Sequence, residues 1–172
     1  AQIDEIERQI LSLALEATSS LHGAIFLWTL NERTLRIDFH VVNGREIELP
    51  HEVVLHKRGQ RSGIAFHVAE TNEPILCNDT SVSEHYAGYF LDVNAIAAAP
   101  ISYQDRAIGV ISVSADSRDA YTTSDLEQLT MLAAHCAPFL RRAQLYRWGK
   151  ARGEGLLIKG LSPEWQVVDE LI

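Results

Sequence analysis

The sequence lacks any long run of apolar residues, and it contains only two cysteines. No stretch approaches the roughly 18 consecutive apolar residues of a membrane-spanning helix, and the N-terminal AQIDEIERQI has no signal-peptide pattern. The cysteines, Cys77 and Cys136, lie far apart without CxxC spacing, which is typical of free thiols in a reducing compartment. We therefore expect a cytoplasmic protein that makes no membrane contact.

Positive charge is also scarce. The 172 residues include 15 Lys and Arg against 23 Asp and Glu, which gives a formal net charge of −8 at pH 7. The late arginines are spaced along one predicted helix and its end, so they form no basic cluster. This balance argues against direct nucleic-acid contact. Since 47% of the residues are apolar, the chain can bury the core of one globular domain with extensions.

Two long helices are predicted near the ends of the chain. In residues 2–19, apolar residues recur three and four apart, and Leu11 and Leu15 begin a second apolar stripe on another face. Residues 123–147 carry two such stripes as well. A helix with two apolar stripes needs two partners.

We expect one stripe of each helix to cover the chain's own core and the other to contact a second copy. The alternative is that the two helices pair within one chain and bury both stripes. The residues expected to form the homodimer contact are Ile3, Ile6, Ile10, Leu13, Leu132, Phe139 and Tyr146.

Short apolar and β-branched runs between the helices are typical of strands. Strands are predicted at 22–30, 35–42, 74–78, 95–102 and 107–115. A short helix from Gly63 to Glu70 is predicted with Ser62 as its cap. This order of elements predicts an α+β fold: an antiparallel sheet with the terminal helices on one face and the insertion 51–93 on the other.

Three segments resemble, in order, the GAF domain family, which is a sensory relative of PAS domains. SGIAFHVAETNEPILCND resembles the family's glycine-to-aspartate signature, with Asn72 where the family often has Gly. NAIAAAPISYQDRAIGVISVSA resembles its pair of core strands, and AYTTSDLEQLTMLAAHCAPFL resembles its closing helix. The resemblance implies a GAF domain in residues 21–147, which includes its closing helix 123–147 and is preceded by a signalling and dimerisation helix in residues 1–20.

The resemblance also implies a small-molecule pocket between the sheet and the insertion. Strand alternation sends Asn94, Ile96 and Ala98 to one face, which we assign to the pocket, although alternation alone permits the inverse assignment. Aromatic residues of the preceding loop are candidates for a lid. The alternative is that these aromatic side chains fill the space and no ligand binds. The expected ligand-binding residues are Cys77, Asp79, Tyr86, Tyr89, Phe90, Asn94, Ile96 and Ala98.

No metal site or catalytic centre is predicted, and no cofactor is identified. Cys77, Asp79 and His85 are three types of metal ligand within nine residues. In iron-binding GAF domains, however, ligands come from strand positions that here resemble Asn94 and Ile96, and neither residue could serve as the expected ligand. The histidines are spaced too irregularly for a zinc site. GAF enzymes that reduce methionine sulfoxide use several cysteines around the pocket, where only Cys77 qualifies. We therefore expect a protein that is not an enzyme.

The C-terminal segment LLIKGLSPEWQVVDELI resembles the start of the AAA+ ATPase module of bacterial transcriptional activators of sigma-54 RNA polymerase. The matching residues are Gly160, Ser162, Pro163, Val168 and Ile172. Because GKARGEG has the composition of a linker, residues 148–172 are expected to form a linker and the start of a following module. The expected function is control of that module by a small-molecule effector. The alternatives are a ligand-free dimerisation module, such as that of a histidine kinase, and a small GAF enzyme that uses Cys77.

Overall fold

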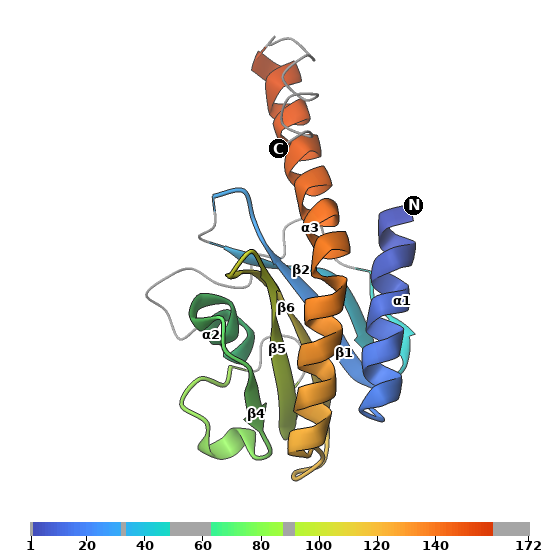
Figure 1. Ribbon diagram of the computed structural model, residues 1–172, viewed down its shortest axis with the longest axis vertical. Coiled ribbons are helices and arrows are strands. Elements are labelled where there is room, and N and C mark those ends of the chain that lie inside the picture. Colours follow the sequence, from blue (N-terminus) through green and yellow to red (C-terminus); the bar gives the residue numbers. More distant parts are fainter. Residues whose placement is uncertain (1, 32–33, 49–62, 88–91, 160–172) are drawn as a thin grey trace.

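The computed structural model describes residues 2–31, 34–48, 63–87 and 92–159 (Figure 1). Its elements are α1 (Gln2–Ala17), β1 (His22–Trp28), β2 (Leu35–Val42), β3 (Arg45–Glu46), α2 (Ile64–Thr71), β4 (Ile75–Cys77), the 3-10 turn η1 (Thr80–Val82), β5 (Ala95–Tyr103), β6 (Arg106–Ala115) and α3 (Thr123–Lys159). The predicted helices and strands that fall within the described residues are present within about two residues, except at the end of α3.

The strands form one six-stranded sheet in the order β3-β2-β1-β6-β5-β4, and every neighbouring pair is antiparallel. The helices α1 and α3 lie side by side on one face, and α2 packs on the other (Figure 1). This arrangement confirms the predicted α+β class. No helix in the described ranges is long and apolar enough to cross a membrane.

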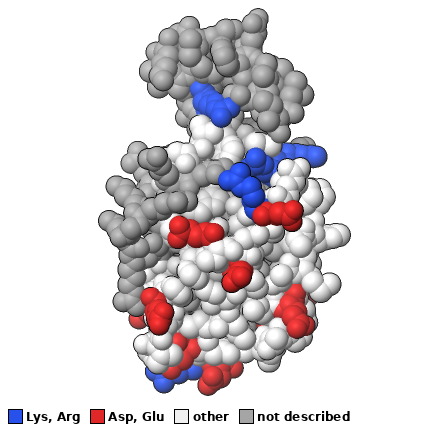
Figure 2. Space-filling view, turned by 60° about the vertical axis from the view of Figure 1, so that its left-hand side comes forward, with Lys and Arg blue, Asp and Glu red and all other residues white. Residues whose placement is uncertain are grey.

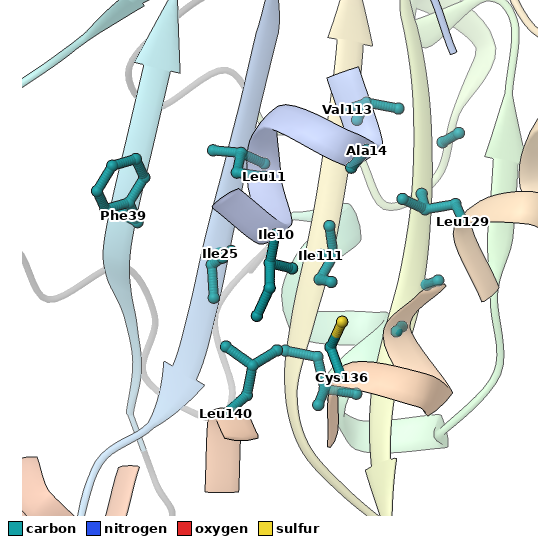
Figure 3. Close-up of a cluster of buried hydrophobic side chains, with 14 of the residues drawn as sticks. Ile10, Leu11, Ala14, Ile25, Phe39, Ile111, Val113, Leu129, Cys136 and Leu140 are labelled. Atoms are coloured by element: carbon teal, nitrogen blue, oxygen red, sulfur yellow. The ribbon is translucent and has the colours of Figure 1, made fainter. Parts of the chain in front are cut away.

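The larger core lies between the sheet and the two long helices. Side chains of α1 and α3, including Leu11 and Leu140, meet Ile25 and Ile111 of the central strands there (Figure 3). On β5 the contribution comes from three fully buried alanines, Ala95, Ala97 and Ala99. Small residues on the strand let α3 lie close to it, so that β5 is packed tightly between α3 and the opposite face.

A β-bulge interrupts the pairing of β1 with β2. Ile25 pairs with Phe39, but the next residue, Phe26, pairs with Ile37, so that Asp38 is the extra residue. Ile37 therefore packs on the α2 side, while Phe39 joins the core beneath α1. The bulge also brings Asp38 within 3.4 Å of Arg147 on α3.

The helix α3 does not end where the sequence predicts. The expected helix stopped at residue 147 and was followed by a linker, but α3 continues without a break to Lys159. Glycine weakens a helix by only about 1 kcal/mol per residue relative to alanine, and α3 even continues through Pro138. The cost of the glycines in 149–155 is thus too small to end the helix, and the linker composition was a misleading signal.

A capping residue precedes each of α3 and α2. Thr122 caps α3, because Asp125 N donates to its Oγ1 at 3.2 Å and its own N donates to Asp125 Oδ2 at 2.8 Å. The N-cap of α2 is Gly63, which has a φ of 89°, a backbone conformation that favours glycine. The predicted cap, Ser62, lies outside the described residues.

Candidate functional site

The space between the sheet and α2 is occupied at its centre by apolar side chains. Phe66 of α2 meets Trp28 of β1 edge to face, with ring centroids 5.4 Å apart at 78°. Val68 is fully buried in the same cluster, together with Ala98 of β5 and Val110 of β6. The helix α2 is thus anchored by its own side chains, and a ligand on this face would lie beside this cluster.

Four of the predicted ligand-binding residues lie around this cluster. In the pairing of β4 with β5, Cys77 lies opposite Ile96, and Ile75 lies opposite Ala98. Ala98 is fully buried, while Cys77, Ile96 and Tyr86 are half-buried against the same cluster. The structure thus places Ile96 and Ala98 on the α2 face, as strand alternation with our choice of face predicted. Their role in ligand binding stays a prediction.

Tyr86 is fixed in place by its own loop. Its hydroxyl donates to Asp92 Oδ1 at 2.7 Å and accepts from the Val93 amide at 3.1 Å. Burial and the neighbouring Asp92 raise the pKa of Tyr86 above its ordinary value. The other two residues of the predicted lid, Tyr89 and Phe90, lie outside the described residues.

Asp79 and Asn94 have structural partners away from the α2 cluster. Asp79 caps η1 by accepting from Ser81 N at 3.1 Å and Ser81 Oγ at 2.6 Å, and these bonds lower the pKa of its carboxyl. Asn94 is exposed, and its Nδ2 donates to the Asp116 carbonyl at 2.7 Å. These contacts hold loop backbone in place, so the structure does not bring Asp79 and Asn94 together with Ile96 and Ala98.

A cavity of about 240 Å³ lies at the C-terminal end of α2, beside the turn between β5 and β6. Asn72 lines it in the left-handed conformation, with its Nδ2 donating to Ser102 Oγ at 3.2 Å. Its buried Oδ1 has no partner within the described part of the chain. The sequence marks Asn72 only as a residue that stands where the GAF family often has glycine. That difference was the one local sign that Asn72 lies at a special position.

A pair of histidines that the sequence did not connect joins α2 to the loop after η1. The rings of His67 and His85 stack at a centroid distance of 3.8 Å and an angle of 14°. Across the described ranges, no three His, Cys, Asp or Glu side chains lie close enough to hold a metal ion. The stacked rings are thus a packing contact between α2 and the loop.

The two cysteines are free thiols on opposite faces of the sheet. Cys77 lies on the α2 face, whereas Cys136 belongs to the core beneath α3, where burial raises the pKa of its thiol. A disulfide between them within one chain is excluded by the sheet that separates them.

The terminal helices expose part of the predicted dimer contact. Ile6, Leu13, Phe139 and Tyr146 are 37%, 54%, 49% and 48% exposed. Ile3 is half-buried, and Leu132 packs partly against the chain's own core. Ile10 is 5% exposed inside that core, so its assignment to the dimer contact was wrong. Ile10 shares the stripe of Ile6 and Leu13, but it lies on the edge of that stripe nearest Leu11 and Ala14, which are buried against the sheet.

Charge is unevenly distributed over the α2 side of the molecule. In Figure 2 acidic side chains are scattered singly among uncharged residues, and basic side chains gather mainly near the two ends. One of these ends is where α3 leaves the sheet (Figure 1). The described residues on this side thus present no continuous basic surface.

Comparisons with solved structures give the same fold at low sequence identity. A methyl-accepting chemotaxis protein is similar with a TM-score of 0.67 and 19% identity over 84% of this chain and 92% of that chain. A domain of a putative two-component sensor histidine kinase from Sinorhizobium meliloti 1021 is similar with a TM-score of 0.58 and 17% identity over 87% and 96%. The comparison with curated proteins gives no match.

An enzyme is among these similar structures. The type II free methionine-R-sulfoxide reductase from Thermoplasma acidophilum has a TM-score of 0.63 and 18% identity over 80% of this chain and 94% of that chain. This likeness corrects the prediction that the chain is not an enzyme, because the fold occurs in enzymes as well as in sensors. The profile of the GAF domain family matches residues 1–141, and the chain therefore belongs to the GAF domain family.

Proposed function

We propose that this GAF domain is a sensor that binds a small-molecule effector on the α2 face and controls an adjoining output module through α3. The observation that supports this most directly is the continuity of α3, which packs on β5 inside the domain and runs on to Lys159. The far end of the same helix is thus rigidly attached to the core of the domain.

The strand β5 offers a physical route between the two faces. Its residues Ile96 and Ala98 point toward α2, while Ala97 and Ala99 are buried in the same core as Ala133 and Leu140 of α3. A displacement of β5 by a ligand would be transmitted directly to the helix because the packing is tight. Transmission requires that the ligand bind with different affinity to two positions of α3.

The finer proposal is that the output module is the AAA+ ATPase of a sigma-54-dependent transcriptional activator. Its support is the resemblance carried by Gly160, Ser162, Pro163, Val168 and Ile172, which lie outside the described residues. We propose further that the chain acts in the cytoplasm as a homodimer joined by its terminal helices, where Leu13 and Phe139 offer exposed apolar surface.

Native mass spectrometry of the chain purified from its own host tests the effector. We expect a retained small molecule, and we expect the Ile96→Trp variant to lose it because the larger ring would cover the surface around the half-buried Ile96 on the α2 face. Glu127→Gln, an exposed change on α3 on the other side of the sheet, is the control that should keep the adduct. Equal adducts on the chain and on Ile96→Trp would place binding elsewhere. The proposal that the domain is a sensor would be refuted if the purified chain had only the mass of the protein and if host metabolites did not raise its thermal stability.

Reduction of free methionine sulfoxide is the second candidate function. It is supported by the half-buried Cys77 beside Tyr86 on the α2 face and by the similar fold of two free methionine-R-sulfoxide reductases. The test is turnover of free methionine-R-sulfoxide with dithiothreitol as reductant. This candidate requires turnover that Cys77→Ser abolishes and Cys136→Ser retains; turnover that persists in Cys77→Ser rules it out.

A further inference from the structure

A second cavity, of about 410 Å³, lies on the helix side of the sheet, where α3 passes the ends of β1 and β2. Its size falls within the range of about 300–1,000 Å³ that is usual for small-molecule sites. The site is separate from the α2 face, and the inference drawn from it does not depend on the proposed function. The residues that line it include Leu27, Leu30, Arg36, Asp38, Arg147 and Trp148.

The rear wall of this cavity is built by buried hydrogen bonds. Gln144, which is 1% exposed, donates from Nε2 to the carbonyls of Trp28 at 3.0 Å and Ile108 at 2.9 Å. Trp148 Nε1 donates to the same Trp28 carbonyl at 3.1 Å. Because these donors are already used, the indole of Trp148 and the side chain of Leu27 present mainly apolar surface to the cavity. The wall is therefore preorganised for a flat apolar group.

The two arginines at the cavity differ in their partners. Arg147 is neutralised by acids, since it donates to Asp4 at 2.6 Å and to Asp38 and Glu7 at 3.4 Å each. Arg36, by contrast, is exposed and has no ion-pair or hydrogen-bond partner among the residues that the structure describes. The cavity thus combines an apolar, indole-lined wall with one spare guanidinium, which binds carboxylates well.

We propose that this cavity binds a planar aromatic carboxylate, with its ring against Trp148 and Leu30 and its carboxylate on Arg36. The ligand would touch β1, β2 and α3 at once. It would therefore fasten α3 to the sheet at the point where the helix extends beyond the domain. Such a site would restrain the helix from its own side of the sheet, independently of any ligand near α2.

The test is a titration of the 172-residue chain with 2-naphthoate and, in parallel, with its neutral analogue 2-naphthamide. A ligand of about 13 non-hydrogen atoms should bind with a Kd on the order of 0.1–1 mM, which ligand-observed NMR can measure. We expect 2-naphthoate to bind about tenfold more tightly than the amide and to shift the indole N–H resonance of Trp148.

Three variants assign the contacts. Arg36→Gln should weaken 2-naphthoate binding about tenfold and remove the preference over the amide, while Arg142→Gln, an exposed arginine of α3, should change neither. Leu30→Trp should abolish binding of both compounds by filling the cavity, with an unchanged circular dichroism spectrum as evidence of folding. No binding up to several millimolar, equal affinity for the two compounds, or binding that survives Leu30→Trp would each overturn the proposal.

Discussion

At the scale of single residues, Glu7 is the most unusual side chain of the described chain. It is fully buried between α1, β2 and α3, and its Oε2 and the Oδ2 of Asp38 are buried without a hydrogen-bond partner among the described residues. Burial and the neighbouring Asp38 raise the pKa of Glu7 to about 10, although Arg147 acts in the opposite direction. We infer that Glu7 is protonated at neutral pH and donates to Asp38.

The Glu7→Gln variant tests this protonation. The folded protein keeps a proton that the unfolded chain releases above about pH 4.5, so stability falls as the pH rises from 5 to 8. The amide of Gln keeps a donor without titrating. We therefore expect the free energy of unfolding of Glu7→Gln to improve relative to the unmodified chain by about 1 kcal/mol or more between pH 5 and pH 8.

Urea unfolding at both pH values measures the difference, with Glu16→Gln as the control because Glu16 is an exposed acid of the same helix. Parallel stability profiles for Glu7→Gln and the unmodified chain would show that Glu7 is ionised throughout.

A second residue-scale feature is Gly109 in β6. A Cβ at this position would lie 2.0 Å from the backbone oxygen of Phe26 and 2.9 Å from Leu27 Cδ2. The strand β1 cannot retreat without losing its pairing, so Gly109→Ala should destabilise the protein by about 3 kcal/mol. The comparison is Gly44→Ala, where no atom lies within 4 Å but φ is +75°, and the expected cost is only about 1 kcal/mol. Thermal unfolding that ranks Gly44→Ala as the worse variant would contradict this close approach.

At the scale of elements, α3 is attached to the sheet by one buried polar side chain as well as by its apolar face. Gln144 bonds carbonyls of β1 and β6, and its Oε1 accepts from Arg141 at 2.5 Å. Apolar packing alone allows a helix to slide by small amounts, whereas these hydrogen bonds fix one register. Gln144 thus sets the position of α3 near the point where it leaves the sheet.

Replacing Gln144 by Leu tests this attachment. The change keeps the apolar volume but leaves the Ile108 carbonyl without its Gln144 donor, so we expect a loss of about 1–3 kcal/mol in the free energy of unfolding. Amide hydrogen exchange should accelerate in residues 141–150 and change little in residues 123–135. Gln128→Leu, an exposed change on the same helix, is the control. Uniform exchange along α3 would argue against a local attachment.

At the scale of the whole molecule, the exposed apolar residues of α1 and α3 lie away from the sheet. Leu13, Phe139 and Tyr146 are about half exposed, and Met131 on α3 is 72% exposed. Their recurrence along two adjacent helices matches the pattern of a helical-bundle contact with a second copy. The core of one chain buries Ile10 and part of Leu132, but it does not cover these exposed residues.

Phe139→Glu should therefore convert a homodimer into a monomer, because a charge would be buried in the contact. Sedimentation velocity at micromolar concentration measures the change, and Val82→Glu is the control because Val82 is 78% exposed in η1, away from both helices. A monomer in both the unmodified chain and the variant would refute the dimer. A dimer that persists in Phe139→Glu would place the interface elsewhere.

The order of elements and the division between the two faces of the sheet followed from the sequence alone, because strand and helix periodicities are local properties. Alternation in residues 94–99 separated Ile96 and Ala98 from Ala95, Ala97 and Ala99, and the structure confirms that Ile96 and Ala98 lie near α2. The family also followed from local motifs, which keep their order and spacing. The dual stripes identified Leu13 and Phe139 as exposed, but single-helix periodicity could not separate them from Ile10.

Only the tertiary structure decided the features that depend on contacts between distant segments. The bulge at Asp38 brings together Glu7, Asp38 and Arg147, and Gln144 reaches two strands, although nothing in the local sequence marks these residues as partners. The helix α3 likewise continues through the glycines of 149–155, although their local composition predicted a linker. Local pattern determines which elements form, whereas burial and pairing across the fold determine which side chains share a site.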